Sequence, residues 1–237
     1  MTLKVTTFSS KGRVSRISSN KCKDKIVHLQ SDNQLRLFMM LEWDDDITEI
    51  EVNPELDYLE ESLSNIDNLK LDKFRDKESG ELFKLHTNFL VTFKPYRGRK
   101  EQTAISVKSL SELERKTVIE KLEIERRYWE AKGIRFAIIT EKEIDKQMVN
   151  NILWVREVRN DKSIKDKEEL AEKLYYFMEG NKDIVINKLL NDFDKKEGVK
   201  EGTGIFLFRY LIALKQIIVD MKKSINLDEK INKLVTF

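Results

Sequence analysis

The 237-residue sequence contains only one cysteine, two prolines, two histidines and eight glycines. The single cysteine, Cys22, excludes an internal disulfide and a cysteine-based zinc site, so a buried or idle thiol is its expected role. No apolar run approaches the roughly 20 residues that a membrane helix needs, and residues 1–10 lack the apolar stretch of a signal peptide. These absences predict a soluble cytoplasmic protein with no membrane partner.

Charge is segregated along the chain, although the formal net charge is only +2. Residues 1–30 carry seven basic residues against one acid, Asp24, which is a pattern suited to phosphate contact. Residues 42–67 reverse the sign, with eleven acids and no base, and we expect this stretch to face away from DNA or toward a basic partner. Ordinary solvated surface is the alternative interpretation of both runs.

The first two thirds of the chain have an α/β pattern. Ser31 and Asp32 resemble a helix N-cap, and Ser111 with Glu114 fits a capping box for a second, longer helix that ends at Gly133. Alternating and β-branched residues predict strands between and after these helices. In order, we expect a helix at 31–42, a strand at 47–52, hairpin strands at 84–93 and 103–107, a helix at 111–132, a strand buried on both faces at 134–140, and a closing helix at 141–155. This order describes an α/β core with a mixed sheet.

The last third of the chain is predicted to be helical. Residues 160–166 are polar without an apolar anchor and form the candidate linker, which gives two domains, 1–159 and 160–237. Helical patterns follow around residues 170–177, 184–190 and 205–221. Three helices with a short tail at 231–237 could form a small, winged-helix-like module.

A set of polar residues lies where a metal-dependent nuclease needs its catalytic groups. Phosphodiester hydrolysis at neutral pH uses divalent cations held by carboxylates, and a nearby lysine can stabilise the phosphate. Restriction-enzyme-like nucleases place one acid on a first helix, one on a hairpin strand, and an acid-x-lysine on the next strand. The corresponding residues are Gln34, Asn88, Ser106 and Lys108. Spacing alone leaves open that they are ordinary surface polar groups.

Longer stretches resemble the TnsA family, the endonuclease subunit of heteromeric cut-and-paste transposases. The resemblance covers residues 10–158 and is looser beyond. It is carried by Thr-Asn-Phe-Leu-Val at 87–91, where the family has Thr-Asp-Phe-Leu-Val, by Val-Lys at 107–108, and by Glu-Lys-Leu-Glu-Ile-Glu-Arg-Arg-Tyr-Trp at 120–129. His-Leu-Gln-Ser-Asp at 28–32, Leu-Glu-Trp at 41–43 and Thr-Glu-Lys-Glu-Ile at 140–144 add to it.

The resemblance implies a restriction-endonuclease-like mixed-sheet domain, followed by a mainly helical, winged-helix-like domain. It also implies Mg²⁺-dependent hydrolysis of the strand at the transposon 5′ ends in a bacterial cell. Its implied partners are double-stranded transposon-end DNA, the TnsB transposase subunit, and the ATP-dependent regulator TnsC.

In this alignment the family's helix glutamate falls on Gln34, its strand aspartate on Asn88, its glutamine on Ser106 and its lysine on Lys108. We expect Gln34, Asn88 and the Val107 carbonyl to mark the metal site. Amides retain oxygen acceptors but lose the negative charge, so they should hold Mg²⁺ far more weakly. Ser106 cannot replace a carboxylate.

Two isosteric changes together favour the hypothesis that the chain was made catalytically silent to trap a complex. A naturally degenerate subunit and a misalignment are the alternatives. The function we expect is that of a DNA endonuclease subunit with impaired catalysis. One alternative is a naturally non-catalytic assembly module that bridges DNA, TnsB and TnsC. Another is a helical adaptor without a nucleic-acid role.

Candidate DNA contacts are Arg13 and Arg16 in the basic arm, followed by cations in the hairpin loop, namely Arg97, Arg99 and Lys100.

Overall fold

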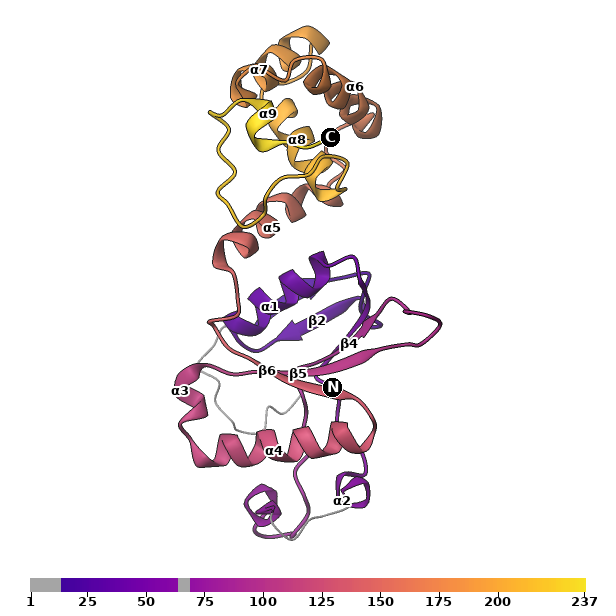
Figure 1. The fold of residues 1–237 in the computed structure, drawn as a ribbon, viewed down its shortest axis with the longest axis vertical. Helices are drawn as coiled ribbons and strands as arrows, with labels where there is room; N and C mark the ends of the chain where they lie inside the picture. Colours follow the sequence, from indigo (N-terminus) through magenta and orange to yellow (C-terminus); the bar gives the residue numbers. More distant parts are fainter. Residues whose placement is uncertain (1–13, 64–68) are drawn as a thin grey trace. The chain divides into compact units, whose positions relative to one another are not determined.

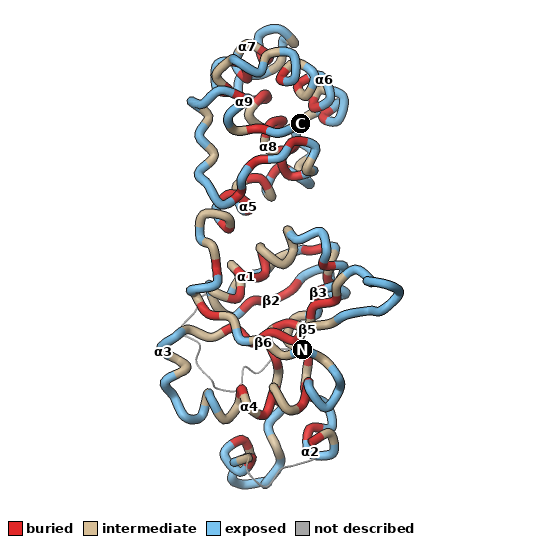
Figure 2. Tube along the Cα trace, viewed as in Figure 1, coloured by how far each residue is buried: buried red, intermediate tan, exposed pale blue. Residues whose placement is uncertain are grey.

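The computed structural model describes residues 14–63 and 69–237. The chain folds into two compact units, Met1–Ile144 and Asp145–Phe237, here called the front unit and the rear unit. No helix within the described residues is long and apolar enough to cross a membrane. Each unit has its own buried core (Figure 2).

A four-stranded mixed sheet forms the centre of the front unit. Its strands are β3 (Ile47–Val52), β4 (Phe89–Phe93), β5 (Gln102–Val107) and β6 (Arg135–Ile139), in the order β3-β4-β5-β6. The first three are antiparallel neighbours and β6 runs parallel to β5. The predicted strand at 47–52, the β-hairpin and the mixed sheet are confirmed.

Helices cover the two faces of this sheet (Figure 1). On one face lies α1 (Asp32–Trp43), whose Phe38 ring packs 6.2 Å from the Phe89 ring. On the other lies α4 (Lys116–Ala131), whose Tyr128 and Trp129 join Ala104 in one apolar cluster. Ser31 caps α1 by accepting a hydrogen bond from the Gln34 amide, as its sequence predicted.

Smaller elements complete the front unit. A short antiparallel pair, β1 (Ser15–Ser18) and β2 (Ile26–Leu29), precedes α1. The excursion between β3 and β4 contains α2 (Leu59–Ser62) and the 3₁₀ turn η1 (Leu71–Phe74).

Two predictions for the segment after the hairpin were wrong. The capping box is Ser109 with Glu112, not Ser111 with Glu114, and it opens a separate short helix, α3 (Leu110–Leu113), only two residues after the end of β5 at Val107. The run at 134–140 is not buried on both faces. It forms β6 at the sheet edge, where Ile138 keeps 41% of its surface exposed.

The rear unit is helical and is built around α8 (Thr203–Ala213), most of whose side chains are buried. Around it lie α5 (Lys146–Arg159), α6 (Lys167–Glu179), α7 (Ile186–Glu197) and α9 (Ile231–Leu234). Residues 145–237 contain isolated β-bridges, Val185 with Lys230 and Ile218 with Thr236, but no strand. The helical domain is confirmed, and its winged-helix arrangement stays a prediction.

The boundary between the units lies at residues 144 and 145, earlier than the expected 159 and 160. The helix expected at 141–155 begins at Lys146 and belongs to the rear unit, where the Asn151 amide donates to the backbone oxygens of Met221 and Lys223 at 2.8 and 2.7 Å. The expected linker, 160–166, therefore lies inside the rear unit between α5 and α6. The helix expected to reach residue 221 ends at Ala213.

A close backbone approach fixes α8 against α7. An added Cβ on Gly204 would lie 2.7 Å from the Leu190 backbone oxygen, and the buried Asp194 carboxylate accepts hydrogen bonds from the Gly202 and Gly204 amides.

We predict that Gly204→Ala lowers the free energy of unfolding by about 1–3 kcal/mol through overpacking, measured by chemical denaturation. Gly180→Ala is the matched control, since its Cβ would make an ordinary 3.5 Å contact. Equal effects of the two changes would contradict this explanation.

Candidate active site

Asn88 lies immediately before the first residue of β4, Phe89, where the backbone ladder with β5 stops. The last paired residues are Phe89 and Ile105, and beyond them the Asn88 side-chain oxygen accepts a hydrogen bond from the Val107 amide at 2.7 Å. The amide side chain thus continues the ladder in place of a backbone carbonyl. Two predicted site residues, Asn88 and Val107, are brought into direct contact, and Lys108 follows immediately in the chain.

Glu125, on α4, is the residue that the sequence analysis missed. Its side chain is completely buried, and one carboxylate oxygen accepts hydrogen bonds from the Thr87 hydroxyl at 2.9 Å and from the Ser106 hydroxyl. The Trp129 indole nitrogen donates to the same Thr87 hydroxyl at 2.8 Å. Ser106 therefore does not stand in for a metal-binding acid here; it ties β5 to the helix below.

The second oxygen of Glu125, Oε1, has no hydrogen-bond partner among the described residues. The Lys121 ammonium lies 3.5 Å from it, one helical turn away, and donates to the His86 backbone oxygen at 3.1 Å. A buried carboxylate oxygen without a full hydrogen-bond complement is uncommon in folded proteins and marks a position worth testing for function. In the sequence, a glutamate within a Glu-rich helix gives no signal of this burial.

Lys108 is half-buried and close to this group. Burial lowers the pKa of its ammonium, the neighbouring positive charge of Lys121 lowers it further, and the acids Glu125 and Glu112 act in the opposite direction. The Lys108 backbone amide donates to the Ile139 oxygen of β6 at 3.0 Å, which fixes its place at the end of β5. Lys108 thus interacts with one further cation, Lys121, and with two acids, Glu125 and Glu112.

Gln34 is buried in the first turn of α1, four residues before Phe38, whose ring packs against the first residue of β4. Its side-chain oxygen accepts a hydrogen bond from the Gln30 amide at 2.8 Å. Within the described part of the chain, no hydrogen bond joins Gln34 to Asn88 or Lys108. Its membership of the site therefore stays a prediction.

The residues present do not fit a magnesium ion. The oxygens of Gln34 and Asn88 are neutral and each already accepts a backbone hydrogen bond. Within residues 14–63 and 69–237 no group of three or more His, Cys, Asp or Glu side chains could hold a metal. Mg²⁺ favours charged carboxylate oxygens, and the carboxylate of this cluster, Glu125, is tied to two hydroxyls and a lysine.

The side chains expected to contact DNA differ in their structural surroundings. Arg97, Arg99 and Lys100 are exposed in the β4–β5 loop, with Arg97 over the Tyr96 ring and Lys100 3.8 Å from Glu49. Arg16 is exposed on β1, opposite His28. Arg13 lies outside the described residues.

Both units match models of one protein family. Residues 44–141 match the TnsA-like endonuclease N-terminal domain, and residues 143–221 match the TnsA endonuclease C-terminal domain. The chain belongs to the TnsA family. It is 36% identical over 160 residues to the transposon Tn7 transposition protein TnsA of Escherichia coli, a region covering 67% of this chain and 56% of that protein.

The TnsA domain matches agree with the structure in two respects. Their division at residues 141 and 143 is close to the boundary between the units at 144 and 145. The α/β mixed sheet followed by helices is the fold class predicted from the sequence. Gln34 lies before the matched N-terminal region, whereas Asn88, Lys108 and Glu125 lie within it.

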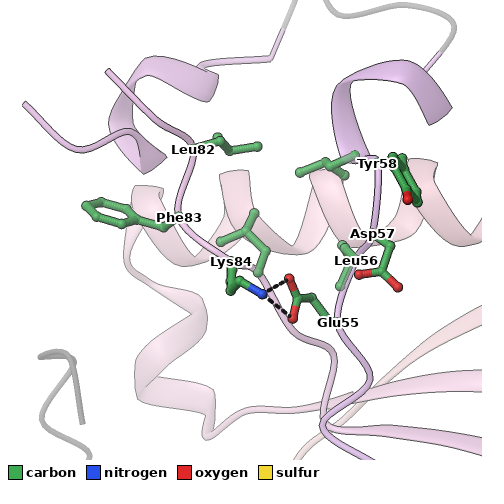
Figure 3. Close-up of a pocket in the computed structure, with 9 residues that line it drawn as sticks. Glu55, Leu56, Asp57, Tyr58, Leu82, Phe83 and Lys84 are labelled. Atoms are coloured by element: carbon green, nitrogen blue, oxygen red, sulfur yellow. Dashed lines mark hydrogen bonds and ion pairs between the residues drawn. The ribbon is translucent and has the colours of Figure 1, made fainter. Parts of the chain in front are cut away.

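A pocket of about 390 Å³ in the TnsA-like front unit lies in the excursion between β3 and β4 (Figure 3). It is lined by residues 55–59 and 82–85, and an ion pair between Lys84 and Glu55 closes one wall. None of the candidate catalytic residues, Gln34, Asn88 and Lys108, lines this pocket.

The electrostatics of this TnsA-family site can be tested by lysine NMR after reductive methylation. We predict that the Lys108 signal titrates below the signals of exposed lysines. Lys121→Met should raise the Lys108 pKa, because it removes a positive neighbour, and Glu125→Gln should lower it, because it removes a negative one. Loss of one signal in Lys108→Arg assigns the Lys108 signal and is the control. An unchanged Lys108 pKa in both Lys121→Met and Glu125→Gln would contradict the interaction of Lys108 with these two residues.

Proposed function

We propose that this chain is the endonuclease-type subunit of a heteromeric transposase, acting on double-stranded transposon-end DNA together with TnsB and TnsC in the bacterial cytoplasm. The observation that carries the proposal is the junction of β4 and β5 in a TnsA-family chain, where Asn88 bonds Val107 and Lys108 follows. In the parent activity, Mg²⁺-dependent hydrolysis of the strand at the transposon 5′ ends, acids at positions 34 and 88 would hold the metal. Lys108 would stabilise the scissile phosphate.

This chain itself should bind DNA but hardly cut it. Its two amides supply no negative charge for a divalent cation, and Lys108 has one cation, Lys121, and two acids, Glu125 and Glu112, acting on it. The Lys108 ammonium itself can attract a phosphate. We therefore derive no metal-dependent step from the residues present.

The second candidate function is a naturally non-catalytic assembly module that bridges DNA, TnsB and TnsC. The hydrogen bonds of Gln34 and Asn88 to backbone amides support it, because both amides have structural partners in the present chain. The two candidate functions differ in one respect. Only the endonuclease should regain DNA cleavage when carboxylates replace the amides at positions 34 and 88.

Reversion of both amides distinguishes them. We predict that Gln34→Glu with Asn88→Asp restores Mg²⁺-dependent nicking at a transposon end, with the partner transposase present. The increase should be on the order of 100-fold or more, as expected for restoring groups that stabilise charge in the transition state. The measurement is strand-specific cleavage of end-labelled DNA.

The control for this assay adds Lys108→Ala to the reverted chain, which should remove the restored cleavage while weakening DNA binding by no more than the loss of one phosphate contact. If the reverted chain binds the DNA and the partner but stays inactive, the endonuclease proposal fails and the assembly module is favoured.

DNA binding should depend on the β4–β5 loop. Replacing Arg97, Arg99 and Lys100 by Gln is predicted to weaken binding to duplex DNA and to reduce the slope of log K against log salt by about 0.9 for each phosphate that is no longer bound. Replacing Lys70, Lys73 and Lys84 by Gln makes the same change in net charge on the excursion and is the matched control. Equal slopes of log K against log salt for the two triple variants would show that the β4–β5 loop does not contact the DNA.

A further inference from the structure

β6 is the edge strand of the front-unit sheet (Figure 1), and no strand among residues 14–63 and 69–237 pairs with its outer side. β6 pairs with β5 on one side only, and its sequence, Arg-Phe-Ala-Ile-Ile, contains one charge and no proline. Proteins usually protect an apolar edge strand with lysines, prolines, bulges or a covering segment. None of the first three is present in β6, and Ile138 is 41% exposed.

The outward-facing backbone groups of β6 follow from its register. Val107 pairs with Ile139, and the Lys108 amide donates to the Ile139 oxygen, so Ile139 directs its backbone toward β5. In a parallel ladder alternate residues do so. Arg135 and Ala137 therefore also face β5, whereas the amide and carbonyl groups of Phe136 and Ile138 point away from it.

Both ends of this edge are already occupied. The Ile134 amide donates to the Trp129 oxygen at 2.8 Å, and the Thr140 amide donates to the Glu143 carboxylate at 2.7 Å. The edge thus offers four groups, the amide and carbonyl of Phe136 and of Ile138, for which no hydrogen bond to another described residue is found.

We propose that β6 pairs antiparallel with β6 of a second copy of this chain, on a two-fold axis at Ala137. In that register Phe136 faces Ile138 of the second copy, and the reverse, so all four free groups on each copy form hydrogen bonds. A two-fold axis at Phe136 would instead need the Ile134 amide, and an axis at Ile138 would need the Thr140 amide. Both are taken. This self-complementarity identifies a second copy as the occupant.

The side chains suit the same register. Ala137 meets its own counterpart at the axis, in a non-hydrogen-bonded pair where Cα atoms approach to about 4.5 Å and a small residue fits. Phe136 beside Ile138 of the second copy is an aromatic and β-branched cross-strand pair, a combination that stabilises sheets. Four interchain hydrogen bonds on one short strand form a small contact, so the pairing belongs to the weak class of interfaces.

Cysteine cross-linking tests the register directly in the full chain. Ala137→Cys lies on the axis and should form a disulfide dimer under mild oxidation, whereas Ile139→Cys is four residues from its counterpart, about 13 Å at the strand rise, too far for a disulfide. The unsubstituted chain controls for Cys22, which is buried. Dimer from Ala137→Cys and little from Ile139→Cys is the expected result; no dimer, or equal dimer from both, overturns the proposal.

Sedimentation at rising concentration gives a second test without cross-links. Ile138→Lys should abolish the concentration-dependent dimer of the unsubstituted chain, while Ile119→Lys, a change at another exposed isoleucine on α4, should leave it. A chain that stays monomeric at all concentrations, or two variants that behave alike, rejects the pairing. Neither test uses DNA or nuclease activity, so its outcome is independent of the proposed function.

Discussion

The buried carboxylate of Glu125 is the interaction on which the arrangement of the front unit depends. It joins the segment just before β4, through Thr87, and β5, through Ser106, to α4, where it also lies 3.5 Å from the Lys121 ammonium. Hydrogen bonds to a charged group are worth about 1.5–3 kcal/mol each, more than neutral ones. These bonds hold the ends of β4 and β5 together below Asn88, Val107 and Lys108, and so determine where any phosphate-binding group at this junction can lie.

The charges around that junction show that the fold does not need a negative charge at positions 34 and 88. Neutral amides can make the same backbone hydrogen bonds as the carboxylates they resemble in shape, and Gln34 and Asn88 each make one. The strands and α1 therefore need no negative charge at these positions. A divalent cation does need it, because amide oxygens bind Mg²⁺ without neutralising its charge. In the proposed function, amides in place of acids at these two positions would leave the scaffold intact and weaken the binding of Mg²⁺.

The sequence predicted the local features of the fold and missed those that depend on distant partners. The Ser31 cap, β3 and the β-hairpin were predictable, because capping residues and alternating patterns act over a few residues. The exposure of β6 was not, since an apolar run looks the same whether or not a further strand covers it. Assignment of α5 to the rear unit rests on hydrogen bonds of Asn151 to residues about 70 positions away, and Glu125 looks like any helix-surface glutamate.

We propose that the junction of β4 and β5 faces the DNA backbone. A structure of the full chain bound to transposon-end DNA and the partner transposase tests it most directly. We expect a backbone phosphate within hydrogen-bond distance of the Lys108 ammonium, with the Asn88 side-chain oxygen still accepting from the Val107 amide. Duplex DNA bound elsewhere, with Lys108 facing only Glu125 and Lys121, would contradict it.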